Sequence, residues 1–129
     1  MQKVQRSVDL LKPEMVRVAK MALRICNLYD LPFAIFETGR TIERQIWLRS
    51  HGKSKTLLSK HLKGEAFDMV LKNPDWSWDY DNNKSLWHTL GYLVPFFAGK
   101  YLGYDIVWGG TWKNFKDFPH FQYKGRING

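Results

Sequence analysis

The chain has 129 residues, of which 44% are hydrophobic and 16% aromatic, and this composition excludes an intrinsically disordered protein. The length is typical of a single domain, so one unit spanning residues 1–129 is expected. Cys26 is the only cysteine, which excludes an intramolecular disulfide. No apolar run approaches the roughly 20 residues of a membrane span, and we recognise no signal peptide at the N-terminus.

The formal net charge of +8, with a pI near 9.7, favours an acidic partner. Nucleic acid, an anionic membrane surface and the anionic bacterial cell wall all meet this condition. Charge by itself does not choose between them.

The first half of the chain predicts a helix, a strand and a second helix. Ser7 is a candidate N-cap for a helix that continues to about Asn27, in which Pro13 is tolerated only if the main helix starts close to it. The apolar run at 33–37 predicts a short buried strand. Thr41 is a suitable N-cap for a helix over residues 42 to 50, and its inner side is expected to consist of Ile42, Ile46 and either Trp47 or Leu48.

The second half predicts three strands and one long helix. Alternating residues predict a strand over 66–71, and apolar residues at helical spacing predict a helix from Lys84 to about Leu102 with a kink at Pro95. Strands are expected at 104–108 and in a final stretch that ends near Tyr123, before a basic tail. This order predicts an α+β domain with a small, mainly antiparallel sheet and helices packed against it.

Two loops have compositions that allow a role in binding. The lysines of the first loop region either line a cleft for an anionic peptide or are simply solvated, and they are Lys53, Lys55, Lys60 and Lys63. The loop at 73–83 carries Trp76, Trp78 and Tyr80, which either form one wall of a substrate groove or pack over the core.

Asp68 is a carboxylate within an otherwise apolar strand, where an unpaired charge is costly. It therefore needs an arginine, a set of N–H donors or a metal ion as a partner. His61 lies seven residues upstream, and Gly64 between them allows the backbone to turn sharply and bring His61 towards Asp68.

His120 lies in the final strand, where alternation places it and Gln122 on the polar face. Two histidines and one aspartate, with a fourth position left open, are the ligand set of a catalytic zinc site, although such residues scattered along a chain often do nothing together. Asp117, three residues before His120, is a candidate general base or acid, or a turn residue before Pro119.

The pattern Ser-x-His-x-x-Gly-x-Ala-x-Asp at 59–68, followed by Trp-Gly-Gly at 108–110 and Asp-x-x-His-Phe at 117–121, resembles a known family. This is the family of zinc D-Ala-D-Ala carboxypeptidases and L-alanyl-D-glutamate endopeptidases, to which several phage endolysins belong. The similarity covers residues 37–122. It implies a Hedgehog/DD-peptidase-like fold and a zinc ion held by His61, Asp68 and His120.

The resemblance also implies roles for residues around that zinc ion. Asp117 would be the general base, and Arg40, after the first predicted strand, would stabilise the developing oxyanion or, in the simpler interpretation, close a surface salt bridge. Ser59, Gln45 and Trp112 are expected to contact the substrate. Ser59 could instead form the turn with its hydroxyl.

The leading hypothesis is a zinc-dependent peptidase that cuts peptidoglycan stem peptides at L-alanyl-D-glutamate, as a phage or prophage endolysin in host lysis. The protein would be a monomer without a specific nucleic-acid partner, made in the host cytoplasm without a signal peptide and acting on the wall after release to the periplasm. One alternative is a D-Ala-D-Ala carboxypeptidase. Another, from a different class, is a basic wall- or nucleic-acid-binding module with a structural zinc.

Overall fold

The computed structural model describes residues 4–54, 56, 59–72 and 76–127. Lys55 and residues 73–75, which the sequence predicts in loops, lie outside the described part of the chain. The main elements are α1 (Pro13–Leu28), β1 (Phe33–Glu37), α2 (Ile42–Ser50), β2 (Ala66–Leu71), α3 (Lys84–Phe97), β3 (Tyr104–Trp108) and β4 (His120–Arg126). Their order is the predicted one, and the α+β fold class is confirmed.

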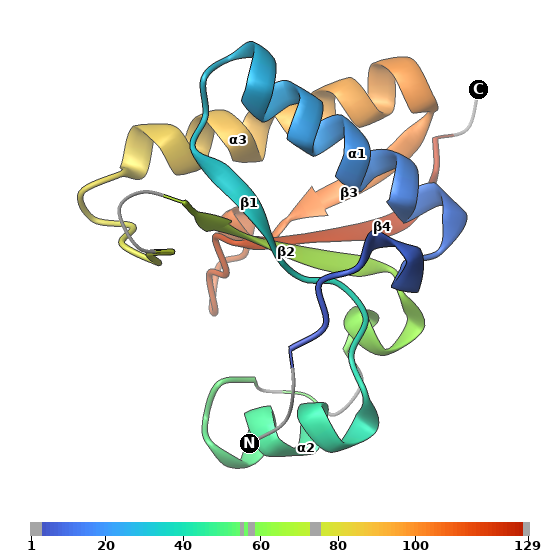
Figure 1. The fold of residues 1–129 in the computed structure, drawn as a ribbon, viewed down its shortest axis with the longest axis vertical. Helices are drawn as coiled ribbons and strands as arrows, with labels where there is room; N and C mark the ends of the chain where they lie inside the picture. Colours follow the sequence, from blue (N-terminus) through green and yellow to red (C-terminus); the bar gives the residue numbers. More distant parts are fainter. Residues whose placement is uncertain (1–3, 55, 57–58, 73–75, 128–129) are drawn as a thin grey trace.

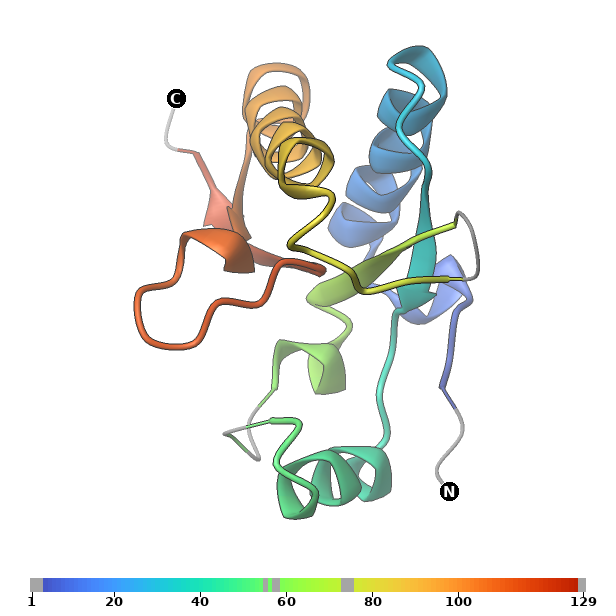
Figure 2. The same ribbon diagram turned by 90° about the vertical axis from the view of Figure 1, so that its left-hand side faces the viewer.

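The four strands form one antiparallel sheet in the order β1-β2-β4-β3. α1 and α3 lie together on one side of the sheet, whereas α2 lies on the side away from them (Figures 1 and 2). In the centre of the sheet, Asp68 of β2 is directly opposite His120 of β4. Opposed residues of an antiparallel pair have Cβ atoms only about 4.5–5.5 Å apart, so the strand register alone brings these two side chains together.

The core fills the space between the sheet and the helices α1 and α3. Phe33 of β1 packs edge-on against Trp87 of α3, with ring centroids 4.8 Å apart. Cys26 is buried in this core, as its apolar surroundings in the sequence predict. Burying each large apolar side chain contributes about 1.5–3 kcal/mol, which fixes the sheet as a platform for the residues at its open side. The fully buried members include Met15, Val18, Ala22, Phe67, Met69, Leu90, Val94 and Phe121.

The first helix begins later than the sequence suggested. The Ser7 hydroxyl caps a separate 3-10 helix (Val8–Leu10), and α1 starts at Pro13, whose missing N–H costs nothing at the first helical position. The long helix also divides, because α3 ends at Phe97 and a π-helical turn (Ala98–Leu102) follows it. Among the described residues, none of the helices combines the length and apolar character that crossing a membrane requires.

The prediction for the inner side of α2 is confirmed for Leu48 and wrong for Ile42 and Ile46. Ile42 and Ile46 are exposed, and the buried residues are Arg44, Gln45 and Leu48. The reason is that α2 covers a polar network instead of an apolar core, so apolar periodicity pointed to the outer surface. The last strand also differs from expectation, since β4 continues through the predicted basic tail to Arg126 by pairing with β3.

Candidate metal centre

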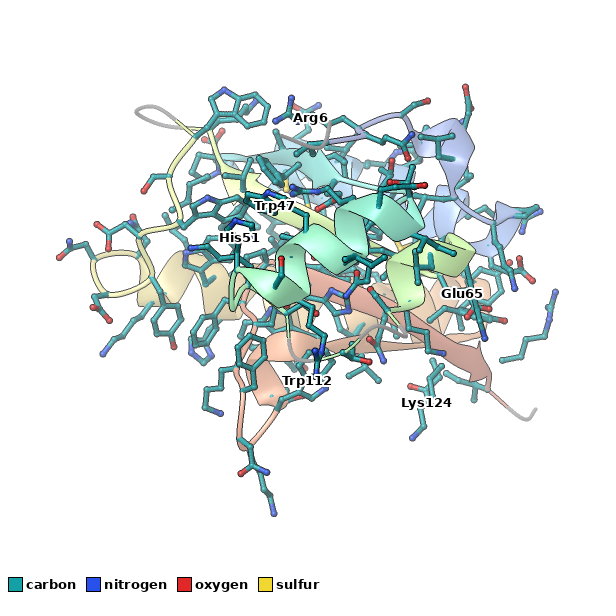
Figure 3. All side chains as sticks on the ribbon, turned by 90° about the horizontal axis from the view of Figure 1, so that it is seen from below. Arg6, Trp47, His51, Glu65, Trp112 and Lys124 are labelled. Atoms are coloured by element: carbon teal, nitrogen blue, oxygen red, sulfur yellow. The ribbon has the colours of Figure 1, made fainter. Side chains whose placement is uncertain are left out.

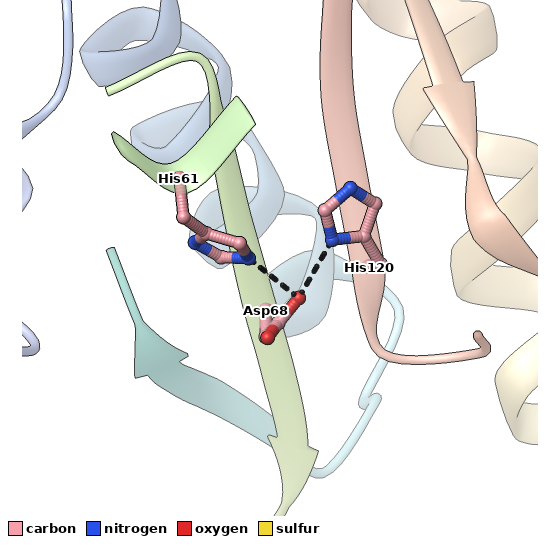
Figure 4. Close-up of side chains that lie close together, drawn as sticks. All are labelled: His61, Asp68 and His120. Carbon is pink, nitrogen blue, oxygen red and sulfur yellow. Dashed lines mark hydrogen bonds and ion pairs between the residues drawn. The ribbon is translucent and has the colours of Figure 1, made fainter. Parts of the chain in front are cut away.

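Three side chains from a 3-10 helix, β2 and β4 meet at the open side of the sheet (Figure 4). His61 comes from a 3-10 helix (Lys60–Lys63) that ends at Gly64, whose φ of 69° is the left-handed turn that glycine permits. His61 Nε2 lies 3.2 Å from Asp68 Oδ1, and His120 Nδ1 lies 3.0 Å from the same oxygen. The expected turn at Gly64 therefore does bring His61 to Asp68.

The hydrogen bond between His61 and Thr38 determines which ring nitrogen of His61 carries the hydrogen. Nδ1 of His61 lies 2.8 Å from the carbonyl oxygen of Thr38, which can only accept, so Nδ1 carries the hydrogen. In the neutral ring Nε2 then presents a lone pair to the Asp68 carboxylate. Two acceptors at 3.2 Å repel unless a proton or a cation lies between them.

His120 repeats this arrangement with its nitrogens exchanged. Its Nε2 lies 2.8 Å from Gln122 Oε1, which leaves Nδ1 facing Asp68. Burial lowers the pKa of His120, but the hydrogen bond and charge of Asp68 outweigh it and raise the pKa above its usual value. Burial likewise opposes ionisation of Asp68, and the two histidines overcome it and hold its pKa well below the usual range. In the metal-free protein these pKa shifts describe a proton shared between an imidazole and the ionised carboxylate of Asp68. In the neutral rings, whose outer nitrogens contact Thr38 and Gln122, both histidines would turn a lone pair towards Asp68.

The separations of these donor atoms fit a divalent cation. The three donor atoms lie within 4.8 Å of one another. Ligand distances of about 2.0–2.2 Å in tetrahedral geometry place neighbouring ligand atoms roughly 3.4 Å apart, close to the separations seen at Asp68 Oδ1. The outer hydrogen bonds that the two rings donate to the Thr38 carbonyl and to Gln122 Oε1 are of the kind that orients histidine ligands around a metal. The group is therefore one that could hold a metal ion.

Arg40 lies beside this cluster and is held there by a buried carboxylate. Its guanidinium donates two hydrogen bonds to Glu37, of 2.9 and 3.1 Å, and lies 3.7 Å from Asp68 Oδ2. Arg44 bonds the same carboxylate at 3.0 Å. Arg40 is thus part of a buried ion-pair network and not the surface salt bridge of the simpler sequence interpretation.

Gln45 completes this network from beneath the site. Its Oε1 accepts from Arg40 at 2.8 Å, and its Nε2 donates to Ser54 Oγ at 2.9 Å. Gln45 is only 1% exposed and is absent from the cavity wall, so the structure does not place it at the substrate surface that the sequence suggested. It links Arg40 to the loop that follows α2.

Asp117 lies at the start of the turn before β4, as the sequence predicted from Pro119. Its carbonyl oxygen accepts from the backbone N–H of His120 at 3.2 Å, and its own N–H donates to Gly109 at 3.0 Å. A Cβ atom at Gly109 would approach the Asp117 carbonyl oxygen to 2.3 Å, so only glycine permits this contact. Burial, and then the negative charge of Asp68, raise the pKa of Asp117 to about 6, although His120, His61 and Arg40 pull it the other way.

A cavity of about 820 Å³ opens over these residues. Trp112 forms part of its wall, with its ring centroid 5.2 Å from that of His120. Ser59 also lines the cavity, but its hydroxyl accepts from the backbone N–H of His61 and so caps the 3-10 helix. Figure 3 views this side of the molecule, with Arg6 and Trp112 on opposite sides of α2. The cavity wall thus offers a polar centre and aromatic flanks.

Sequence reasoning missed four residues that orient the site, namely Glu37, Thr38, Arg44 and Gln122. Glu37 did leave a signal, because it is a charged residue at the end of an apolar strand with arginines three and seven positions later. Gln122 left another, since it shares the polar face of β4 with His120. The Thr38 carbonyl is a backbone group, and no feature of the sequence reveals it.

The cavity contains two histidines and an aspartate, and the carboxyl group of Asp117 lies beside them. This arrangement is typical of the class of metal-dependent hydrolases. The chain belongs to the M15 peptidase family described as D-alanyl-D-alanine carboxypeptidase, which matches residues 52–123. The resemblance inferred from the sequence motifs is confirmed.

Two named proteins are similar to this chain in sequence. It is 40% identical to the L-alanyl-D-glutamate peptidase of Listeria phage A118 over 97 residues, which are 70% of this chain and 31% of that protein. It is 35% identical to the peptidoglycan L-alanyl-D-glutamate endopeptidase CwlK of Bacillus subtilis over 95 residues, 68% of this chain and 50% of CwlK. The match therefore spans a half or less of these curated relatives.

A solved structure agrees over nearly the whole chain. The crystal structure of the Serratia marcescens L-Ala D-Glu endopeptidase ChiX superposes with a TM-score of 0.75 at 34% sequence identity. This alignment covers 96% of the present chain and 90% of the ChiX chain. The fold and the relative positions of its elements are thus shared with that endopeptidase.

Proposed function

We propose that this chain is a zinc-dependent peptidoglycan peptidase that cleaves stem peptides at the L-alanyl-D-glutamate bond. The observation that carries the proposal is the pair of histidine lone pairs turned towards the ionised Asp68, which only a proton or a cation can bridge. The names of the three relatives support the choice of bond.

In the proposed site His61, Asp68 and His120 hold the zinc ion, since two imidazoles and one carboxylate are a ligand set that zinc prefers. When bound, zinc supplies a Lewis acid that polarises the scissile carbonyl and acidifies a water molecule. Thr38 and Gln122 keep both imidazole rings in place through the nitrogens that do not face Asp68.

Asp117 is the proposed general base, because its carboxylate lies on the cavity wall with His61, Asp68 and His120 and does not belong to the group of three metal ligands. It would take a proton from the attacking water and pass it to the leaving amine. Arg40 is the proposed donor to the oxyanion that develops on the scissile carbonyl, because Glu37 already fixes its direction. Trp112 and Ser59, on the cavity wall, remain proposed substrate contacts.

The second candidate is a D-Ala-D-Ala carboxypeptidase, which the description of the matching family favours. The cavity is better suited to an endopeptidase, because its lining continues past Asp68 towards Phe36 of β1 on one side and towards Gln122 of β4 on the other. Substrate residues on both sides of the scissile bond then find room. A pure binding module with a structural zinc needs neither Asp117 nor this open cavity.

The proposal extends to the biological setting. One zinc peptidase domain, acting as a monomer, would be released from the host cytoplasm to the periplasm and open the wall during phage lysis. Its net charge of +8 favours attraction to the anionic wall.

The test is the release of new free amino groups from purified peptidoglycan. We expect release by the wild-type protein, loss after treatment with a chelator, and recovery when zinc is returned. Release that continues undiminished in the zinc-stripped protein would contradict the proposal.

A further inference from the structure

We propose that the rim of the cavity beside β1 binds the sugar chain of peptidoglycan. The binding surface, here called the aromatic ledge, consists of Arg6, Phe36, Trp76 and Trp78. This inference rests on the proposed function, since it names a second part of the same substrate.

The four side chains of the aromatic ledge form one continuous surface. Phe36 and Trp78 pack edge to face, with ring centroids 4.7 Å apart and planes at 80°. The Arg6 guanidinium carbon lies 4.9 Å from the centroid of Phe36 and 5.6 Å from that of Trp76. Arg6 also donates a hydrogen bond of 3.0 Å to the carbonyl oxygen of Phe36, which ties the N-terminal segment to the end of β1. The surface is thus assembled before any ligand arrives.

Both tryptophans of the aromatic ledge remain open to solvent. Trp76 is 48% exposed and Trp78 is 47% exposed. Trp76 has a φ of 57°, a left-handed conformation that is costly for a bulky residue. Two hydrogen bonds between Leu71 and Ser77 hold the chain beside it in this path. Strained backbone positions with exposed side chains are characteristic of ligand-binding sites, because an exposed side chain gains little packing energy to offset the conformational cost.

The aromatic ledge continues directly into the proposed active site. Phe36 and Trp78 belong to the cavity wall that also contains His61, Asp68 and His120. A ligand on the aromatic ledge and a peptide at the metal centre can therefore be parts of one molecule.

One end of the cavity is aromatic and the other carries a lysine. The two sides of the scissile bond differ correspondingly, with a sugar on one side and carboxylates on the other. The aromatic ledge lies on the β1 side of Asp68, whereas Lys60 is tied to Tyr123 of β4, on the other side of β2. In the stem peptide, L-alanine is attached to the muramic acid sugar, and the carboxylates begin at D-glutamate. The aromatic end therefore suits the sugar, and the end with Lys60 suits the carboxylates.

The reach of the chain requires the sugar to lie near the metal centre. One extended residue spans at most about 3.6 Å, and a single alanine separates the scissile bond from the sugar's lactyl group. Aromatic faces bind the C–H groups of a pyranose ring through their negative π surfaces. The aromatic ledge provides such faces at the cavity rim.

The test compares two substrates that differ only in the sugar, namely a disaccharide-linked stem peptide and the same stem peptide without sugar. We expect Trp76→Ala to lower kcat/KM for the sugar-linked peptide about tenfold more than for the bare peptide, which corresponds to an aromatic contact of about 1.4 kcal/mol. Trp76→Phe, which keeps an aromatic face, should restore most of the difference. Phe96→Ala, which removes an exposed aromatic residue of α3, is the matched control and should leave the ratio unchanged.

Equal losses on both substrates, or no loss on either, would overturn the proposal. If the wild-type protein cuts neither substrate, the proposed function fails, and a binding experiment still tests the aromatic ledge. The N-acetylglucosaminyl-N-acetylmuramic acid disaccharide alone, added to the zinc-loaded wild-type protein, should shift the indole N–H signals of Trp76 and Trp78 in NMR spectra. Shifts confined to Trp112, or no shifts at millimolar disaccharide, would overturn the inference.

Discussion

Glu37 fixes Arg40 against Asp68. The guanidinium of Arg40 donates to both carboxylate oxygens of Glu37 and lies 3.7 Å from Asp68 Oδ2. Burial opposes ionisation of Glu37, but the hydrogen bonds from Arg40 and Arg44 prevail and lower its pKa, so Glu37 is charged at neutral pH. Arg40 therefore points towards the metal centre before any substrate binds.

Arg40→Ala should lower kcat by about 10²–10³, the usual loss when a donor to a developing oxyanion is removed. Glu37→Gln should lower kcat by about 10–100-fold, because a neutral amide orients the guanidinium less strictly. Since Glu37 acts through Arg40, the double variant should be no slower than Arg40→Ala alone. Steady-state kinetics on soluble stem peptides measure all three. Losses that multiply in the double variant would show that Glu37 acts independently of Arg40.

The purified protein should contain one zinc ion per chain, because His61, Asp68 and His120 provide three suitable donor atoms. Elemental analysis should show that the zinc is lost in the His61→Ala, His120→Ala double variant. His51→Ala is the control, since His51 is exposed at the end of α2 and, in the part of the chain that the structure describes, its ring bonds to the neighbouring Ser50 and Trp47. A zinc content that stays at one per chain in the double variant would refute this ligand assignment.

The Asp117→Asn variant should still bind zinc but should hydrolyse the substrate much more slowly. The substitution preserves size but removes the proton acceptor, so hydrolysis should fall by at least ~10²-fold with zinc retained. Asp68→Asn should weaken zinc binding itself, because it removes the carboxylate between the two histidines. Parallel zinc and activity measurements separate the two roles. The opposite pattern, with metal lost from Asp117→Asn and kept by Asp68→Asn, would mean that base and ligand are exchanged.

In the metal-free protein, Asp117→Asn should raise the melting temperature at pH 7.5. Burial and the charge of Asp68 raise the pKa of Asp117 from its ordinary value of 3.8 to about 6. The folded state thus binds a proton more tightly than the unfolded state, so ionised Asp117 lowers stability fully above about pH 6. Asparagine removes this cost, and its advantage should shrink as the pH falls from 6 towards 4. A stabilisation that does not change over this pH range would contradict the electrostatic explanation.

Much of the fold followed from local patterns. Alternation located β2 and the start of β4, Thr41 located the first turn of α2, and Gly64 located the turn that carries His61. These features succeed because each depends on residues that are close together in the sequence. The motif spacing was sufficient to select the residues that the structure brings together around Asp68.

The features that the sequence did not predict depend on contacts between segments that are distant in the chain. The exposure of Ile42 and the burial of Arg44 follow from Glu37, which lies on another element and offers a carboxylate to α2. The orientation of His61 follows from a backbone carbonyl of Thr38, 23 residues away. Only the assembled sheet places these groups together, so periodicity within one helix cannot reveal them.

The position of the bond that is cut distinguishes an L-alanyl-D-glutamate endopeptidase from the alternatives. Purified peptidoglycan digested with the zinc-loaded protein can be analysed by mass spectrometry of the released peptides. We expect peptides that begin with D-glutamate at a new amino terminus, with L-alanine left on the sugar, and at least ~10²-fold fewer such products from Asp117→Asn. Release of free D-alanine with the L-alanyl-D-glutamate bond intact would show that the protein is a carboxypeptidase instead of an endopeptidase.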